Sequence, residues 1–205
     1  MRALLLVDIQ NDFLPGGALA VPHGDEVIPA ANQLQPRFPL VVATQDWHPP
    51  DHLSFAVNHF GRKVYEHIDL AGLPQTLWPA HCVQHTRGAE LASGLERARI
   101  ARIFQKGTAR EIDSYSGFFD NGHRRSTGLS DWLKEKGVTD LFVCGLATDY
   151  CVKFTALDAV QLGFKTHLLV DATRAVNLQP GDFEAAVKEM KRAGVSIMES
   201  SQLRA

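Results

Sequence analysis

The chain has 205 residues, enough to bury a sizeable core without disulfide or metal staples. Its 21 Lys and Arg residues against 23 Asp and Glu leave a formal net charge of −2, which argues against a nucleic-acid or anionic-membrane partner. No apolar run approaches the ~20 residues of a membrane span, and the 3 scattered cysteines fit a reducing compartment. We therefore expect a cytoplasmic protein.

The first part of the chain predicts two strands and one helix, followed by an irregular segment. Continuous apolar runs at 3–7 and 40–44 predict buried parallel strands. Between them, apolar residues spaced three and four apart predict a helix at 26–35, with Pro29 in its first turn. Residues 45–87 show no clean period and are broken by Pro and Gly, which is typical of a long functional loop.

The remainder alternates between helices and strands. In chain order it predicts a short helix near 89–97, a strand at 101–105, a helix from Leu129 to Gly137, a strand at 141–144, a helix from Thr148 or Asp149 to Gly163, a strand at 166–170, a helix after Pro180 and Gly181, and a strand at 195–198. This alternation predicts one α/β domain over residues 1–205, in three layers: a mostly parallel six-stranded sheet with helices on both faces.

Polar residues follow several of the predicted strands directly. They are Asp8 after the first strand, Asp46 and His48 after the second, Lys106 after the third, and Cys151 in the loop after the fourth. In open α/β sheets, ligands bind beyond the carboxyl ends of the strands. We therefore expect these side chains to meet at one edge of the sheet.

Cys151 is a candidate nucleophile because it falls in the first turn of a predicted helix. Free N–H groups and the helix dipole favour a thiolate there, and the N–H groups of Ala147 and Cys151 could form an oxyanion hole. Asp8 could remove the thiol proton, and Lys106 would add positive potential favouring both anions. The alternative is that Cys151 is a small buried hydrophobe and Asp8 an ordinary strand-end residue.

Histidines are concentrated in the irregular segment, which holds six of the 9 in the chain. Asp46 and His48 are two residues apart, so in an extended segment they point the same way. His52 and His81 are available to complete a site for one divalent ion such as zinc, iron or manganese. The alternative is that these histidines are surface groups. We expect the segment at about 45–87 to be the metal-binding part of the domain.

Five motifs together resemble the nicotinamidases of the isochorismatase-like cysteine hydrolase superfamily, and the resemblance runs nearly end to end. The Asp, Lys and Cys elements are typical of the whole superfamily, whereas Asp-Trp-His with Trp-Pro-Ala-His-Cys is specific to the nicotinamidase branch. The motifs are Val7-Asp8-Ile9-Gln10-Asn11-Asp12-Phe13, Asp46-Trp47-His48-Pro49-Pro50-Asp51-His52, Trp78-Pro79-Ala80-His81-Cys82-Val83, Phe104-Gln105-Lys106-Gly107 and Gly145-Leu146-Ala147-Thr148-Asp149-Tyr150-Cys151-Val152.

The resemblance implies an isochorismatase-like fold and a role for each matching residue. Asp8, Lys106 and Cys151 would form the catalytic triad. Asp46, His48 and His81 would hold one divalent metal ion (Zn, Fe or Mn), and the counterpart of His52 is a ligand in some members only. Phe13, Trp78 and Tyr115 would bind the substrate, although by themselves they read as core aromatics. The family also has a cis peptide bond where Leu146-Ala147 falls.

The activity implied by the resemblance is hydrolysis of nicotinamide to nicotinate and ammonia through a cysteine thioester, a reaction of NAD salvage. The partner would then be a small-molecule substrate, without nucleic acid or membrane, and a homo-oligomer stays open. Alternatives are a cysteine hydrolase of another small amide, such as a carbamoyl or ureido compound, and a metallohydrolase in which Cys151 is incidental. A protein that binds a metal or a pyridine ring without catalysis is a further alternative.

Overall fold

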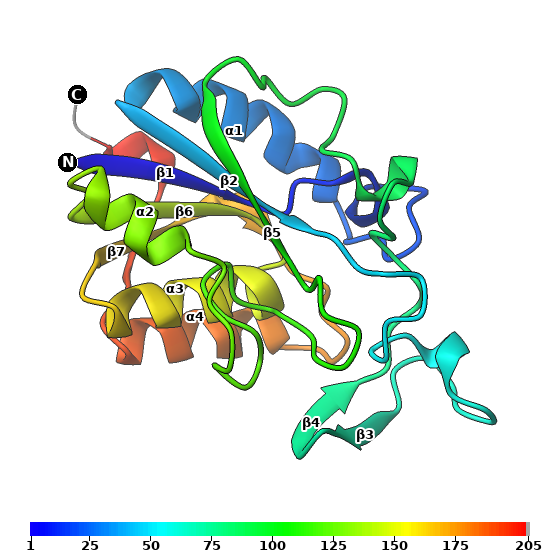
Figure 1. Ribbon diagram of the computed structural model, residues 1–205. Helices are drawn as coiled ribbons and strands as arrows, with labels where there is room; N and C mark the ends of the chain where they lie inside the picture. Colours follow the sequence, from blue (N-terminus) through cyan, green and yellow to red (C-terminus); the bar gives the residue numbers. More distant parts are fainter. Residues whose placement is uncertain (204–205) are drawn as a thin grey trace.

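The continuous apolar runs form one parallel sheet in the computed structural model, which describes residues 1–203 (Figure 1). Its strands are β1 (Arg2–Val7), β2 (Leu40–Asp46), β5 (Ile100–Lys106), β6 (Asp140–Leu146), β7 (Lys165–Arg174) and β8 (Ser196–Met198). They are ordered β5-β2-β1-β6-β7-β8, and each neighbouring pair is parallel. The predicted six-stranded sheet is therefore confirmed. The first five strands extend one to four residues past a predicted end, whereas β8 begins one residue later than predicted.

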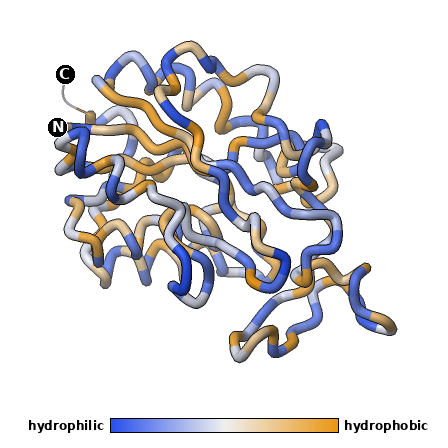
Figure 2. Tube along the Cα trace, in the orientation of Figure 1, coloured by the Kyte–Doolittle hydropathy of each residue, from blue (hydrophilic) through white to orange (hydrophobic). Residues whose placement is uncertain are grey.

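Helices cover both faces of this sheet, which gives the predicted three layers (Figure 1). They are α1 (Val27–Leu34) on one face and α2 (Leu129–Glu135), α3 (Lys153–Gln161) and α4 (Asp182–Arg192) on the other. Strand β1 alternates between the two layers, since Leu4 and Leu6 pack with α1 while Leu5 packs with the other helices. Figure 2 shows hydrophobic colouring along the central strands, as expected for a sheet that helices cover on both faces.

The helix predicted near 89–97 is wrong. The structure has a single 3-10 turn at Arg87–Ala89, followed by one bridge residue and a series of turns and bends. Backbone groups of this segment bond to the loop after β1 instead: the Ala92 N–H donates to the Ile9 carbonyl at 2.9 Å, and Leu91 forms an antiparallel bridge with Gln10. Leu91 and Leu95 are both buried, so their helix-like spacing reflects burial of an irregular segment.

The irregular segment contains a β-hairpin that the sequence did not predict. Strands β3 (His67–Leu70) and β4 (Leu73–Thr76) pair antiparallel through a two-residue turn. Both turn residues, Ala71 and Gly72, have positive φ, of 54° and 82°, as a type I′ turn requires. The hairpin projects from the end of the sheet at which the strands finish (Figure 1). Its strands are only partly buried, so their apolar alternation is weak.

The helix after β6 begins differently from the prediction. A π-helical turn, Thr148–Val152, precedes α3, and its N-cap is Ala147 rather than Thr148 or Asp149. The Asp149 carboxylate instead accepts hydrogen bonds from the backbone N–H groups of Val176 and Asn177, at 2.9 and 2.8 Å. That side chain therefore fixes the loop after β7 and does not cap the helix.

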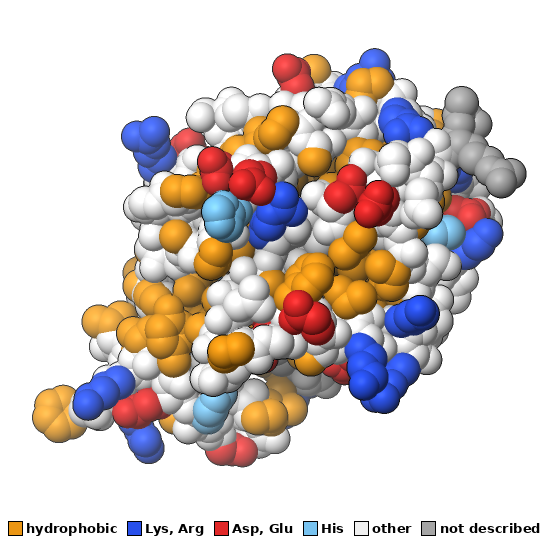
Figure 3. Space-filling model, turned by 180° about the vertical axis from the view of Figure 1, so that it is seen from behind, with side chains coloured by type: hydrophobic (Ala, Val, Ile, Leu, Met, Phe, Trp, Pro, Cys, Tyr) orange, Lys and Arg blue, Asp and Glu red, His pale blue; other side chains and the backbone are white. Residues whose placement is uncertain are grey.

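Charged side chains of both signs are interspersed over the face shown in Figure 3. Within residues 1–203, no helix is long and apolar enough to cross a membrane.

Candidate active site

Four polar side chains meet at the carboxyl edge of the sheet. They come from four strands: Asp8 after β1, Asp46 at the end of β2, Lys106 at the end of β5, and Cys151 in the turn after β6. All are buried, with at most 7% of any of these residues exposed. Strands β1 and β6 are neighbours from which the strand order proceeds in opposite directions, and open α/β sheets bind ligands at such a point.

The Lys106 ammonium group lies at the centre of this cluster. Its Nζ donates hydrogen bonds to Asp46 Oδ1 at 2.6 Å, to the Ser114 carbonyl at 2.7 Å and to Cys151 Sγ at 3.4 Å. Asp8 Oδ2 lies 2.9 Å from the same nitrogen. The lysine therefore connects the thiol with both carboxylates.

The charges in this cluster depend on one another. Burial disfavours the ammonium form of Lys106, but Asp46 and Asp8 outweigh burial and raise the lysine pKa well above its usual value. Burial likewise acts to raise the pKa of Asp46, yet Lys106 and His48 hold that pKa well below its ordinary value. The Lys106–Asp46 pair therefore stays charged although water is excluded.

Asp8 and Cys151 are shifted in the other direction. Burial raises the pKa of Asp8 in spite of the nearby Lys106 charge, and it raises the pKa of the Cys151 thiol well above its usual value. The sequence-based expectation of a favoured thiolate is therefore wrong for the resting site, because desolvation outweighs Lys106. Asp8 Oδ2 forms an ion pair with Lys106 Nζ, and a hydrogen bond between the Cys151 thiol and the Asp8 side chain also raises the pKa of the thiol. Asp8 is therefore placed to take the thiol proton.

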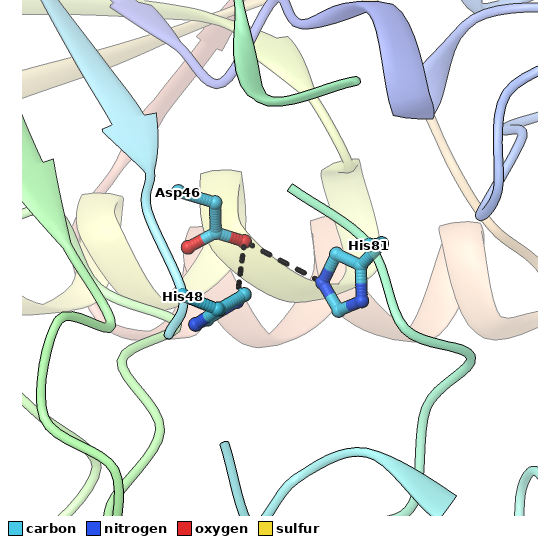
Figure 4. Close-up of side chains that lie close together, drawn as sticks. All are labelled: Asp46, His48 and His81. Atoms are coloured by element: carbon cyan, nitrogen blue, oxygen red, sulfur yellow. Dashed lines mark ion pairs between the residues drawn. The ribbon is translucent and has the colours of Figure 1, made fainter. Parts of the chain in front are cut away.

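Asp46, His48 and His81 form a candidate metal centre beside this cluster (Figure 4). Asp46 Oδ2 lies 3.5 Å from His48 Nε2 and 3.8 Å from His81 Nε2. The other ring nitrogens are directed away: His48 Nδ1 bonds to the Gly107 carbonyl and His81 Nδ1 to the Pro79 carbonyl, both at 2.8 Å.

This arrangement fits a bound cation. A ring whose Nδ1–H donates to a carbonyl has its lone pair on Nε2, the atom that binds a metal. His48 Nε2 is buried and makes no hydrogen bond within residues 1–203. A buried, unbonded ring nitrogen next to a carboxylate and a second imidazole is a donor set for a borderline divalent ion.

His52 lies beside His48, with ring centroids 4.4 Å apart, but its nitrogens are engaged elsewhere. Its Nδ1 accepts the Ser54 backbone N–H at 3.2 Å, which places the ring proton on Nε2, 3.3 Å from the Ile112 carbonyl. His52 can be grouped with His48 and Asp113 but not with all three residues of the candidate metal centre. A direct bond from His52 to an ion there would require loss of the contact with Ile112.

We expect His52 to make metal-free protein less stable as the pH falls from 6.5 to about 4. Burial, together with His48, lowers the pKa of His52 from 6.5 to about 4. Between these values the unfolded chain takes up a proton that the folded chain does not, so stability decreases toward low pH. Urea denaturation across this range should give a shallower decline for His52→Gln than for the parent protein. The exposed His85→Gln is the control, and an unchanged decline in His52→Gln would contradict this prediction.

A narrow pocket lies above Cys151. Its walls include every residue predicted to touch the substrate, namely Phe13, Trp78 and Tyr115, together with Ala147, Asp46 and His81. The aromatic rings meet edge to face: the Trp78 centroid lies 4.8 Å from that of Tyr150 and 6.4 Å from that of Tyr115. Sequence reasoning missed four lining residues: Leu19, Asp113, Tyr150 and Val176. Of these four, only two could have been suspected from the sequence. Tyr150 is adjacent to Cys151, and Asp113 lies two residues before Tyr115.

The backbone before Cys151 brings Ala147 to the same pocket. The Leu146-Ala147 peptide bond is cis, as the resemblance implied. The Ala147 carbonyl accepts hydrogen bonds from the N–H groups of Tyr150 and Val152, both at 3.1 Å. Gly145, at the end of β6, has a φ of 115°, and a Cβ there would lie 2.1 Å from the Val7 carbonyl oxygen. Glycine is therefore required where this backbone approaches β1.

The other two cysteines have no polar role in this pocket. Cys144 is fully buried in β6, and burial raises the pKa of its thiol to about 12. Cys82 is also fully buried, and its backbone N–H donates to Asp12 Oδ2 at 2.7 Å. Cys151 is therefore the cysteine placed to react.

Comparison with known proteins agrees with the fold and the site. The isochorismatase domain matches residues 2–202, and the chain belongs to this family. A nicotinamidase of Escherichia coli K12 is 54% identical over 200 residues, covering 96% of this chain and 93% of the relative. An Acinetobacter baumanii nicotinamidase and pyrazinamidase superposes with a TM-score of 0.96 at 46% identity, over 99% of this chain and 98% of that one. Within the family, the chain thus lies in the nicotinamidase branch of carboxamide hydrolases.

A solved pyrazinamidase of Pyrococcus horikoshii, in complex with zinc, is 40% identical with a TM-score of 0.79. The alignment covers 97% of this chain and 98% of that chain.

Proposed function

We propose that this chain hydrolyses nicotinamide to nicotinate and ammonia through a thioester on Cys151. The observation that carries the proposal is the set of contacts of Lys106 Nζ, which join the Cys151 thiol, Asp8 and Asp46 at the base of one aromatic pocket. The 54% identity to a nicotinamidase over nearly the whole chain supports the choice of substrate.

Asp8 acts as the base in this proposal. Its carboxylate takes the Cys151 proton while sulfur attacks the carboxamide carbon, so that no free thiolate is needed in the buried resting site. The N–H groups of Ala147 and Cys151 would hold the oxyanion. Lys106 keeps a positive charge beside Asp8 and Sγ throughout.

The remaining steps return the enzyme to its starting state. Asp8 gives its proton to the amide nitrogen, the C–N bond breaks and ammonia leaves. Water then attacks the thioester carbonyl and gives a proton to Asp8, and the C–S bond breaks to release nicotinic acid, which loses its remaining proton to solvent and becomes nicotinate. Asp8 finally returns that proton to the Cys151 sulfur. Each proton that moves between the Cys151 sulfur, the amide nitrogen and the attacking water thus passes through the carboxyl group of Asp8.

We propose that Asp46, His48 and His81 hold one divalent metal ion, zinc, iron or manganese, which when bound supplies Lewis acidity and orients the pyridine ring. The charges near the pocket support a cation there. Lys106 is the one buried ammonium group here, and it contacts two buried carboxylates, those of Asp8 and Asp46. A divalent cation held by Asp46 would compensate buried negative charge that a single ammonium group does not balance.

The ring of the substrate would lie between Phe13 and Trp78. Both are almost fully buried pocket residues, at 6% and 3% exposed, and Phe13 lies 5.6 Å from His81 between ring centroids. This lining favours a flat aromatic amide over the carbamoyl and ureido compounds that other cysteine hydrolases of this fold would accept.

Ammonia release from nicotinamide, before and after chelation, tests the function. We expect metal-loaded protein to release ammonia and chelated protein to do so about 100-fold more slowly, with recovery on adding zinc, iron or manganese. Benzamide, which lacks only the ring nitrogen, should be a poorer substrate. No release by metal-loaded protein would overturn the substrate assignment, and equal rates before and after chelation would overturn the role of the metal.

Several expectations from the sequence stay predictions. They are a role of His52 as a metal ligand, a cytoplasmic location, one domain over residues 1–205, the absence of nucleic-acid and membrane partners, and a possible homo-oligomer.

A further inference from the structure

Asp113 is a buried carboxylate in the pocket wall that the proposed chemistry does not use. The residue is only 3% exposed and lines the pocket together with Tyr115. A buried carboxylate needs hydrogen-bond donors. The Ser114 backbone N–H donates to Asp113 Oδ1 at 2.7 Å, and the side chain of Gln75 donates to Oδ2 at 3.1 Å. Gln75 thus contacts Asp113 from the projecting hairpin, outside the loop that carries Asp113.

The Gln75 amide contacts a second residue of the pocket wall. Gln75 is 3% exposed, and its Nε2 also donates to the Tyr115 hydroxyl at 3.2 Å and to the Thr76 carbonyl at 2.8 Å. The Tyr115 hydroxyl accepts a further hydrogen bond from Trp78 Nε1 at 3.1 Å. One amide group therefore connects the carboxylate of Asp113 with the ring that packs against Trp78.

The backbone of the loop that carries Asp113 is held independently of Gln75. The Asn121 N–H donates to the Asp113 carbonyl at 2.8 Å, and Asn121 Oδ1 accepts the Tyr115 N–H at 2.9 Å. The Ser114 carbonyl, which accepts a hydrogen bond from Lys106, lies between these two anchors. Loss of the Gln75 amide would therefore leave the side chains of Asp113 and Tyr115 with one donor each, the Ser114 N–H and Trp78 Nε1, and would leave the contact with Lys106 in place.

We propose that Gln75 is a positioning residue of the substrate pocket, which orients Asp113 and Tyr115 through its side-chain amide. The inference rests on the proposed hydrolysis of nicotinamide. Because the two oriented side chains form pocket wall, while the hydrogen bond to Cys151 Sγ comes from Lys106, loss of their support weakens binding more than it slows the chemical step. The β3–β4 hairpin thereby gains a function, that of holding one wall of the pocket.

Steady-state kinetics of Gln75→Leu test the proposal, since leucine is of similar size and has no donor. We expect KM for nicotinamide to rise about tenfold while kcat stays within about twofold. In a Tyr115→Phe background, which lacks the hydroxyl, the same substitution should raise KM by a smaller factor, because the two residues act together.

Gln35→Leu is the matched control. Gln35 is fully buried and its Nε2 donates to the Glu96 carbonyl at 2.8 Å, away from the pocket. A purely structural loss lowers the amount of active enzyme and hence apparent kcat, so KM should be unchanged in this control. An unchanged KM in folded Gln75→Leu, or an equal rise in Gln35→Leu, would overturn the proposal. If Gln75→Leu does not fold, Gln75→Met decides by the same criterion.

Calorimetric binding of nicotinamide separates this inference from the proposed function. In Cys151→Ala, which cannot form a thioester, we expect nicotinamide to bind, and to bind about tenfold more weakly once Gln75→Leu is added. Absence of binding to metal-loaded Cys151→Ala would contradict the proposed function itself. Equal binding by the single and double variants would contradict only the role of Gln75.

Discussion

Replacing Cys151 by alanine is expected to lower kcat/KM for nicotinamide by about 10⁴-fold or more, because the variant has no nucleophile to form the thioester. The fold should persist, because the substitution removes only one sulfur atom from this buried residue and adds no new group. Ammonia release and circular dichroism of the variant test this pair of expectations.

The same substitution decides between two mechanisms that use the same pocket. If the candidate metal centre activates water and Cys151 is incidental, Cys151→Ala keeps its activity, and full retention would refute the thioester mechanism. Cys144→Ala is the matched control, because Cys144 is equally buried but lies in β6 away from the pocket. Its activity per folded molecule should equal that of the parent protein. Mass spectrometry of the parent enzyme, quenched during turnover, should detect the acyl group on Cys151.

Replacing Lys106 by methionine is expected to lower both activity and stability. The variant keeps the length of the side chain but leaves Asp8 and Asp46 buried without their cation. Breaking a buried pair in this way costs about 3–5 kcal/mol, and Lys106 is only 2% exposed, so solvent screening does not reduce the effect. We expect kcat/KM to fall about 10³-fold, because the proton transfers lose their positive neighbour.

The stability loss in Lys106→Met should depend on pH with a definite sign. Without the ammonium group, the folded-state pKa of Asp46 rises above that of the unfolded chain, and the pKa of Asp8, which burial already raises, rises further. The folded variant then binds more protons than the unfolded one, so its deficit is largest near neutral pH and shrinks as the pH falls toward the carboxyl range. Urea denaturation of metal-free protein at several pH values measures this.

The control for this prediction is Lys165→Met. The Lys165 side chain is 69% exposed and lies 3.8 Å from Asp140, so its removal should change stability by less than about 1 kcal/mol at any pH. A pH-independent deficit in Lys106→Met, or one no larger than in Lys165→Met, would show that the buried ion pairs are not the source of the effect.

Much of the sheet was predictable because each strand of a parallel sheet covered on both faces appears in the sequence as a continuous apolar run. The run from Ala3 to Val7 in β1 is apolar at every position, since successive side chains enter opposite layers and both layers exclude water. The residues that end these runs, Asp8 and Lys106 among them, were predicted to meet because parallel strands finish at one edge. The six strands and that convergence follow from local pattern and topology.

The segments that were predicted wrongly are those whose partners are distant in sequence. The segment after Ala89 looked helical from the spacing of Leu91 and Leu95, but its backbone bonds to the loop after β1. The β3–β4 hairpin has half-exposed strands, so alternation did not reveal it. A local sequence pattern does not show which distant backbone group a segment will form hydrogen bonds with.

The sequence by itself determined the strands, their order along the chain and the set of polar residues that meet at the carboxyl edge of the sheet. Only the tertiary structure decided which of these residues are protonated and which other side chains hold the pocket in place. Cys151 and Asp8 have raised pKa values because folding removes water from them, an effect of depth that spacing cannot encode. Gln75 matters through an amide that reaches two residues about forty positions away. Desolvation and contacts between distant segments arise only when the chain is packed.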